Sequence, residues 1–542
     1  MPIRQSMQVA LRSLAAAILC AAVLPAGTAF AQADSNRTTF LLSRAFDGGL
    51  PNGVSRNAAV SHDQRIARDI AYESDATNIV PGDTNGLTDV FVVHRSGPWG
   101  SNGTPWNIGG TDLVSHGLGG LPANGRSYRP AVDGDSHHSP SCVAFVSDAS
   151  NLVPGDTNGK PDAFVYNLNS KKIVRVSTDS HGRQSNGSAY EVAVDGDCER
   201  VAFVSDATNL ALTSTKIGAW KSAVTSRPAA GTKQVYVKVL KGARLDRGFR
   251  GLTFLASASA KGKAGRGDSQ RVSFARAGKA LVFSSLAGNL TKGDHNGVLD
   301  VYERTFIRKF THIAGKGVQN FAFATKLVSA GSSGSAGNGP STNPTVTDDG
   351  RYVAFETLAG NLAPGDTNGV SDVLEADMAG RHAKQKWVSK SAFSGLGNGP
   401  SNHPVVSDAG EFVLFDSLAD NLRPSASVST DDNGVRDVFL WNRPSGNVSL
   451  ESRNAANGYL DTPSQHPATS ARGNYVPFES ANPDIDPTVA VAKFSAVDDG
   501  IQVPDLIDPD VIAPTVPTVD TPGLVGPDPG LQQVYVRYLG PQ

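Results

Sequence analysis

The sequence has little of several features that would place it in other classes of protein. It contains only 3 Met and 3 Cys among 542 residues, and 49 Lys and Arg are balanced by 51 Asp and Glu. A net charge of −2 provides no basic excess for binding nucleic acid. No long 3.6-residue hydrophobic period occurs, which disfavours a helical domain. After the first residues there is also no stretch of about 18 apolar residues, so we expect no membrane span.

Glycine and proline, by contrast, are abundant, with 57 and 32 copies. Apolar residues alternate over short stretches bounded by Gly, Asn, Asp and Pro, which is the pattern of short strands joined by turns. The length alone would suggest three or four domains, but the composition favours an all-β fold made of many short strands.

Residues 1–33 have the pattern of a secretory signal peptide. Arg4 and Arg12 supply the positive start, residues 11–24 contain the apolar stretch, and residues 29–31 read Ala-Phe-Ala, which suits a signal peptidase. We therefore expect an exported protein, periplasmic or extracellular.

Two cysteines, Cys142 and Cys198, would remain after cleavage. They occupy the same kind of turn in consecutive repeats, and an oxidising compartment permits a disulfide between them. Whether it forms depends on the distance between the two Cα atoms, so the sequence leaves the bond open.

One strand pattern of the type Val-Ala-Phe-Val-Ser recurs along the chain. Its central aromatic residues are Tyr72, Phe145, Phe203, Phe283, Phe355, Phe415 and Phe478. Their uneven spacing around a fixed motif indicates loops of variable length on a repeated framework.

Each copy of the pattern has the same neighbours in the same order. A strand such as 130–132 and an Asp-Gly turn precede it, and strands such as 89–92 and 113–115 follow it. Four short strands repeated radially are typical of a propeller blade, so we predict an all-β, seven-bladed β-propeller of four-stranded antiparallel blades. Residues 39–43 form a spare fourth strand that would pair with the last strand, 533–538, and close the ring. Six or eight blades remain open because the seventh unit is degenerate.

These units resemble the TolB-like β-propeller repeat, a relative of the WD repeat that is common in exported bacterial proteins. The resemblance rests on the Asp-Gly turn, the Val-Ala-Phe strand and the Asp-Val-Phe-Val strand, and it covers residues 38–540. It implies a periplasmic or extracellular scaffold that binds proteins, while some relatives are enzymes or carry a peptidase.

A second motif, Asp-x-Asn-Gly-x-x-Asp, occurs in five units. Its polar residues are Asp83, Asn85 and Asp89; Asp156, Asn158 and Asp162; Asp294, Asn296 and Asp300; Asp366, Asn368 and Asp372; and Asp431, Asn433 and Asp437. Gln234 and Gln533 stand at the last position in the third and seventh units. Spaced carboxylates around a glycine resemble a calcium loop, because this cation takes six to eight oxygen ligands. The same residues also build Asx-type turns, and both interpretations stay open.

The histidines show no spacing that is typical of metal ligands. His137 and His138 are adjacent in a turn, His295 lies inside one Asp-x-Asn-Gly loop, and His403 and His466 each precede a proline. We expect all of them in turns or on the surface.

Two segments depart from the repeat. Residues 238–271 are basic, and residues 481–530 are rich in proline and aspartate. Each is either a docking surface or a solvated loop carried by a rigid scaffold.

We expect a monomeric binding or scaffold protein, without catalytic residues, for a protein or cell-envelope component. The inner strands, such as Ala58-Ala59-Val60 and Pro404-Val405-Val406, are small and apolar and show no converging titratable set. One alternative is a propeller enzyme, a lyase or hydrolase of glycans or lactones, with its site in the central channel. Another is a calcium-stabilised structural repeat protein, and calcium is the one cofactor that the sequence suggests.

Overall fold

The computed structural model describes most of the chain from residue 37 to residue 540. The residues left out within this range are 64–66, 98–105, 136–137, 211–215, 218–219, 222–225, 245–248, 314–315, 392, 394, 423–430, 432, 455–459, 483–484 and 487–530. The predicted signal peptide and most of segment 481–530 therefore lie outside the described residues. Within the described part of the chain, no helix is long and apolar enough to cross a membrane.

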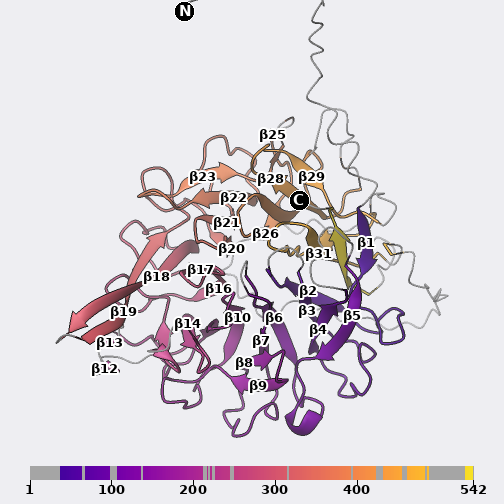
Figure 1. Cartoon of the computed structure of the whole chain (residues 1–542). Coiled ribbons are helices and arrows are strands. Elements are labelled where there is room, and N and C mark those ends of the chain that lie inside the picture. Colours follow the sequence, from indigo (N-terminus) through magenta and orange to yellow (C-terminus); the bar gives the residue numbers. More distant parts are fainter. Residues whose placement is uncertain are drawn as a thin grey trace, which may run out of the picture.

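The protein is a seven-bladed β-propeller, as predicted, with seven four-stranded antiparallel sheets around one axis (Figure 1). Blade 1 consists of β2 (Ser55–Val60), β3 (Asp69–Ser74), β4 (Asp89–Arg95) and β5 (Ile108–Leu113), and blade 2 of β6 (Ser127–Val132), β7 (Cys142–Ser147), β8 (Asp162–Asn167) and β9 (Lys172–Arg175). Blade 3 consists of β10 (Ala189–Val194), β11 (Arg200–Ser205), β14 (Gln234–Val239) and β15 (Thr253–Leu255), and blade 4 of β16 (Ser269–Phe274), β17 (Ala280–Ser285), β18 (Asp300–Ile313) and β19 (Lys316–Leu327).

The remaining blades follow the same order from the axis outward. Blade 5 consists of β20 (Ser341–Val346), β21 (Tyr352–Thr357), β22 (Asp372–Asp377) and β23 (Lys384–Trp387), and blade 6 of β26 (Ser401–Val406), β27 (Phe412–Ser417), β28 (Asp437–Asn442) and β29 (Val448–Leu450). Blade 7 consists of β30 (Ser464–Gln465), β31 (Tyr475–Ser480), β32 (Gln533–Tyr538) and β1 (Thr38–Leu41). Outside the blades lie the hairpins β12 (Lys216–Ile217) with β13 (Trp220–Lys221) and β24 (Lys390–Ser391) with β25 (Gly395–Leu396), and a 3-10 turn, η2 (Leu118–Gly120).

The hydrophobic core lies between the blades. Successive side chains of a strand point to opposite faces of its sheet, so each blade packs on both neighbours. In β7, Phe145 joins the cluster shared with blade 1, whereas Val146 joins the cluster shared with blade 3. Phe145 also stacks on Phe164 of β8, with ring centroids 5.7 Å apart. The repeated Val-Ala-Phe strand is therefore hydrophobic on both faces because both faces are buried.

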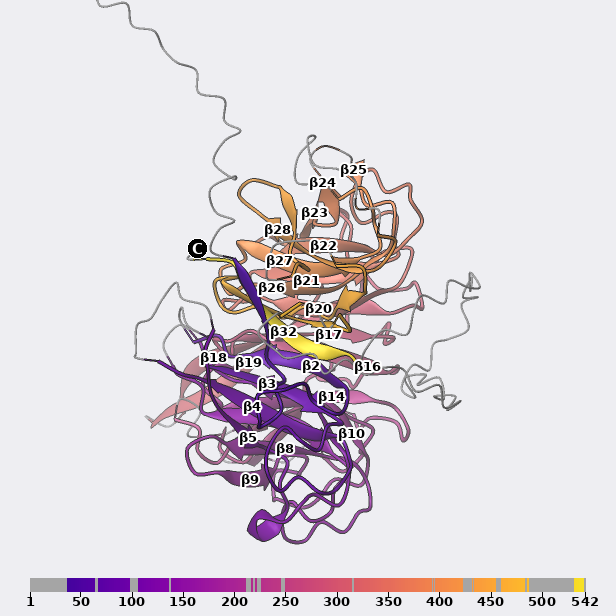
Figure 2. The ribbon, with the colours of Figure 1, turned by 90° about the vertical axis from the view of Figure 1, so that its right-hand side faces the viewer.

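The N-terminal strand closes the ring by pairing with the last strand, as predicted. Phe40 of β1 is opposite Val536 of β32 in an antiparallel ladder, and yellow β32 lies against the indigo N-terminal strands (Figure 2). The carboxylate of Asp486 accepts the N–H of Leu41 at 2.8 Å and pairs with Arg44 at 2.6 Å. The start of the acidic segment thus fastens the closing strand.

Two segments differ from expectation. The basic residues 238–271 are not an insertion, because they contain the end of β14, all of β15 and the start of β16. Instead, β18 and β19 run for 14 and 12 residues, and this long hairpin extends beyond blade 4 at the edge of the ring (Figure 1). The repeat motif covers only the part of β18 that pairs with β17, so it did not reveal the extension.

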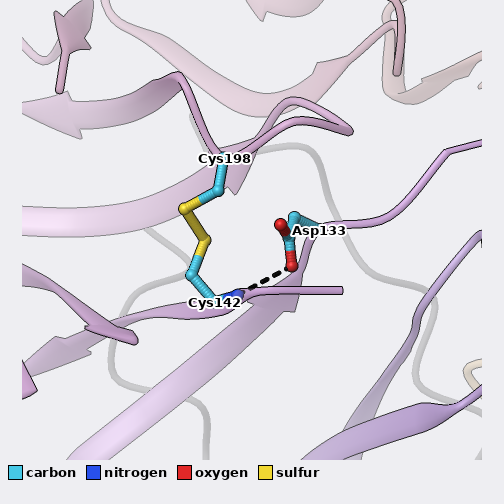
Figure 3. A group of neighbouring side chains, drawn as sticks. All are labelled: Asp133, Cys142 and Cys198. Carbon is cyan, nitrogen blue, oxygen red and sulfur yellow. Dashed lines mark hydrogen bonds between the residues drawn. A yellow bond between two sulfur atoms is a disulfide. The ribbon is translucent and has the colours of Figure 1, made fainter. Parts of the chain in front are cut away.

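Cys142 and Cys198 form a disulfide between blades 2 and 3 (Figure 3). Their Cα atoms are 6.3 Å apart, which is within the range that a disulfide spans. The carboxylate of Asp133 accepts the N–H of Cys142 at 2.9 Å beside this bond. Because the two sulfur atoms are bonded to each other, neither is a thiolate ligand for a metal.

Candidate functional site

In six of the seven blades a non-glycine residue has a positive φ angle at the same point, which is the third residue of the inner strand or, in blade 7, the residue directly after it. These residues are Asn57, Arg129, Arg271, Asn343, His403 and His466, with φ between 48° and 54°. In blades 1, 2, 4, 5 and 6 the ladder to the second strand shifts register there, which marks a β-bulge. Such a conformation costs roughly 1 kcal/mol or more per residue and tends to occur at functional sites.

A bulge removes one N–H from the strand ladder, and that N–H needs another acceptor. In five blades the acceptor is a carboxylate of the preceding blade, at 2.6–3.0 Å. The pairs are Asn57 with Glu479, Arg129 with Glu73, Arg271 with Glu191, His403 with Glu356, and His466 with Asp416. Carboxylates, all buried except that of Glu191, thus join neighbouring blades and fix the backbone that holds the side chains near the axis.

We call the side chains of Asn57, Arg129, Glu191, Arg271, Asn343, His403 and His466 the axial ring. All seven stand on inner strands or directly after one, and the inner strands surround the axis (Figure 1). None is fully buried, so solvent reaches this end of the inner strands.

One side of the axial ring consists of two histidines that are each held by a carboxylate. His403 Nδ1 lies 2.8 Å from Asp416, His466 Nδ1 lies 2.8 Å from Glu479, and the two imidazole rings are 4.2 Å apart. Burial would lower the pKa of His466, but the charges of Glu479 and Asp416 outweigh it and raise that pKa. A carboxylate on Nδ1 fixes the tautomer and the orientation of an imidazole, which leaves Nε2 for a ligand or for proton transfer.

The carboxylate of Asp416 interacts with several positively charged side chains. Burial acts to raise its pKa, but the hydrogen bond from His403 and the positive charges of His403 and Arg436 act more strongly, and the pKa is lowered. Asp416 therefore stays ionised beneath the two histidines.

The opposite side of the axial ring carries two arginines. Glu191 lies between two guanidinium groups, 2.9 Å from Arg129 and 3.9 Å from Arg271. The side chains of the two arginines are 23% and 38% exposed. Two partly exposed guanidinium groups beside each other suit the binding of an anionic group.

The other end of the inner strands is bridged by the turns that follow them. Backbone hydrogen bonds link these turns from blade to blade: Gly134 to Gly196, Gly196 to Arg276, Ala277 to Asp348, Asp348 to Asp408, and Asp408 to Ala471. His62 of blade 1 joins them through Asp408 of blade 6. We call this connected set of turns the turn hub.

Charged groups are packed closely in the turn hub. Arg276 donates to the carbonyl oxygen of Val132 at 2.8 Å, and burial lowers its pKa despite the nearby carboxylates of Asp133, Asp195, Asp348 and Asp408. Burial raises the pKa of both Asp133 and Asp195 to about 7. Arg276, Asp348 and Asp408 are partly exposed, as the axial ring is, but the turn hub differs from the axial ring in being joined by backbone hydrogen bonds from turn to turn.

The Asp-x-Asn-Gly-x-x-Asp loops do not converge on the axial ring; each serves its own blade. In blade 1, Asn85 donates to Asp89 at 2.6 Å and accepts the N–H of Leu87 at 2.9 Å, and Ser115 donates to Asp89. The same bonds recur in the motifs of blades 2, 5 and 6, at Asn158, Asn368 and Asn433. The Asn and the last Asp thus have the role of a structural turn.

Histidines were expected in turns or on the surface, and the expectation of a turn was wrong for two of them, whose side chains are 36% and 37% exposed. His403 and His466 lie in the axial ring and not in turns, whereas His138 does lie in a turn, 2.6 Å from Asp197 and 3.1 Å from Asp135. His137 lies outside the described residues.

The expectation of apolar inner strands was also wrong, because it rested on the residues after the bulge. Two signals in the sequence were missed. One is the polar residue directly before each apolar segment. The other is the acidic residue directly after the central aromatic residue of the second strand, as in Glu73 and Glu479.

Comparison with known proteins shows the fold alone. No protein-family model and no curated protein matches the sequence. The solved structures that resemble it include an oligogalacturonate lyase from Vibrio parahaemolyticus (9% identity, 93% of this chain and 96% of that chain covered, TM-score 0.41) and a putative TolB from Agrobacterium tumefaciens (13%, 63% and 83%, 0.32). A puromycin-hydrolyzing peptidase from Mycobacterium tuberculosis also resembles it (11%, 79% and 51%, 0.42). At these identities the likeness is that of distant propellers.

Proposed function

We propose that the protein is an exported propeller of the TolB-like kind that binds a protein partner through the axial ring. The ligand group is a carboxylate of the partner, at an acidic side chain or a chain end. One observation carries this proposal: the guanidinium groups of Arg129 and Arg271 come together at Glu191 on the axial ring, and both side chains are partly exposed. Bidentate guanidinium–carboxylate contacts suit such a ligand.

Two further observations support the proposal. Strained bulges and buried carboxylates hold the axial ring rigidly, which lowers the entropy lost on binding. The disulfide between Cys142 and Cys198 supports export, because such bonds persist in oxidising compartments.

An array of acidic peptides with free carboxyl ends tests this function. The double variant Arg129→Gln/Arg271→Gln should lose at least 10-fold in affinity for the peptides that the wild type binds, because a charge-assisted hydrogen bond contributes roughly 1.5–3 kcal/mol. The matched control is Arg351→Gln, which removes an arginine that pairs with Asp377 outside the axial ring. Equal binding by the wild type and the double variant would reject the assignment.

A second candidate function is acid–base catalysis on a glycan or a lactone. It is favoured by the two histidine–carboxylate pairs, in which Asp416 and Glu479 occupy Nδ1 and leave Nε2 for the substrate. In a screen of glycans and lactones, His403→Gln and His466→Gln should each lower kcat by about 10²- to 10⁴-fold. Turnover that survives both substitutions would exclude these histidines as the catalytic groups.

A further inference from the structure

The structural turn in the Asp-x-Asn-Gly-x-x-Asp loops does not need the first Asp of the motif. In blades 3 and 7 a single neutral residue, a glutamine, makes the hydrogen bonds that the Asn and the last Asp make in the other blades. Gln234 accepts the hydroxyl of Ser257 at 2.8 Å, and Gln533 accepts that of Ser43 at 2.9 Å. The amides of these glutamines also donate to loop carbonyl oxygens, as the motif Asn does elsewhere. A pair of carboxylates is therefore more than the turn requires.

In blade 1 the first Asp is buried without a well-formed partner. Asp83 is 6% exposed, and neither of its carboxylate oxygens makes a well-aligned hydrogen bond within the described part of the chain, although the N–H of Asn85 is near. The neighbouring carboxylate of Asp89 is fully buried, and burial together with the charge of Asp83 raises the pKa of Asp89 to about 6. Two such carboxylates repel each other when both are ionised.

Blade 4 repeats this arrangement more tightly. Asp294 and Asp300 are 1% and 0% exposed, and the carboxylate of Asp294 lies within hydrogen-bonding reach of that of Asp300. The hydroxyl of Tyr302 donates to one oxygen of Asp294. Among the described residues, Oδ1 of Asp294 and Oδ2 of Asp300 have no well-aligned hydrogen-bond partner. Buried polar atoms in native proteins rarely lack partners, and buried charges are usually paired or bound to metals.

Blade 2 shows what such a carboxylate pair holds when the chain itself supplies a cation. The guanidinium of Arg175 lies 3.3 Å from Asp156 and 3.6 Å from Asp162, and its side chain is 11% exposed. Arg175 stands opposite the third-strand aromatic Phe164. In the same register, Leu113 faces Phe91 in blade 1 and Leu327 faces Tyr302 in blade 4. Those two loops have the carboxylates of blade 2 but an apolar side chain in place of its cation.

We propose that blades 1 and 4 each bind one Ca²⁺, between Asp83 and Asp89 in blade 1 and between Asp294 and Asp300 in blade 4. The unpartnered carboxylate oxygens are the first ligands, and backbone carbonyl oxygens and water complete the shell of a hard cation. In blade 2 the guanidinium of Arg175 takes the place of the ion. This inference is independent of the ligand proposed for the axial ring.

Calorimetric titration of chelator-treated protein with Ca²⁺ tests the proposal. The wild type should bind at least two ions per chain, and Asp83→Asn/Asp294→Asn should bind two fewer. The matched control, Asp156→Asn, changes the same motif position in the loop that contains Arg175 and should bind as many ions as the wild type. No binding by the wild type, or the same number of ions bound by the double variant, would overturn the proposal.

Thermal unfolding gives a second readout that does not depend on the double variant being fully stable. Ca²⁺ at about 100 times its Kd should raise the wild-type Tm by about 5 °C. Mg²⁺ should raise it less, because this ion keeps its waters and needs near-ideal octahedral geometry. An unchanged wild-type Tm would reject cation binding, and an equal shift with Mg²⁺ would reject the assignment to calcium.

Discussion

The two ends of the inner strands use the same types of residue in opposite ways. At the axial ring, carboxylates of one blade accept the bulge N–H groups of the next, and Arg129, His403 and His466 remain partly exposed. At the turn hub, backbone hydrogen bonds run from turn to turn, and Arg276 lies among several carboxylates. Both ends join neighbouring blades, one through carboxylates and strand N–H groups and the other through backbone hydrogen bonds between turns.

The comparison shows that a cluster of charges does not by itself mark a functional site. The turn hub contains the more strongly shifted pKa values, with Asp133 and Asp195 both at about 7. Its groups are nevertheless engaged with one another and with the backbone. The positive φ angle that recurs at the same point in six blades separates the axial ring from it.

The largest effect is expected from removing the disulfide, which lies at the turn hub. Cys142→Ser/Cys198→Ser removes a crosslink beside the turn hub that spans 56 residues, and a loop of that length corresponds to about 4 kcal/mol of stability. Urea unfolding should show this loss. Adding a reductant should lower the wild-type midpoint to that of the variant and leave the variant unchanged. Equal midpoints for the two proteins would mean that the turn hub is stable without its disulfide.

The next effect concerns the cation of the turn hub. Arg276→Met leaves the carboxylates of Asp133 and Asp408 without their shared positive charge, and we expect a loss of about 3 kcal/mol in urea unfolding at neutral pH. The control, Arg351→Met, removes an exposed partner of Asp377 and should leave the midpoint unchanged. If the midpoint of Arg276→Met equals that of the control, the charge of Arg276 does not stabilise the turn hub.

A smaller effect is expected in the axial ring. Asp416→Asn keeps the shape of the side chain but removes the charge that His403 and Arg436 share, and the free energy of unfolding should fall by about 2 kcal/mol. The substitution should also lower the pKa of His466, because Asp416 helps to raise it; NMR titration measures this shift. Asp377→Asn, at an exposed pair outside the ring, should leave it unchanged. If the pKa of His466 stays the same, the two histidines are not coupled through Asp416.

The last effect is a pH dependence, which is spread over several pH units. Burial raises the pKa of Asp133 and Asp195 from 3.8 to about 7. Between these values the folded state binds more protons than the unfolded state, so stability should fall as pH rises from about 4 to about 7 and then level off. Each group contributes a slope of up to about 1.4 kcal/mol per pH unit. Asp133→Asn should flatten the slope in urea unfolding at several pH values, and an unaltered slope would assign it to other groups.

The repeat could be predicted from the sequence, but the site could not. Seven aromatic markers with alternating apolar neighbours require seven sheets with both faces buried, and the spare strand at residues 39–43 indicated the closure that the pairing of Phe40 with Val536 confirms. These features are local and periodic. The axial ring is neither, since Arg129, Glu191 and Arg271 are separated by 62 and 80 residues and meet only after blades 2, 3 and 4 have packed together.

The sequence by itself indicated the repeated strands and their order and favoured seven blades over six or eight, because hydrophobic alternation and turn residues act over short distances. Only the tertiary structure decided which polar residues share an environment. Arg175 meets Asp156 and Asp162 because strand pairing places it there, and the same register places Leu113 and Leu327 in the neighbouring motifs. Electrostatic interactions depend on distance and burial, and both are set by the packing of segments that lie far apart in the chain.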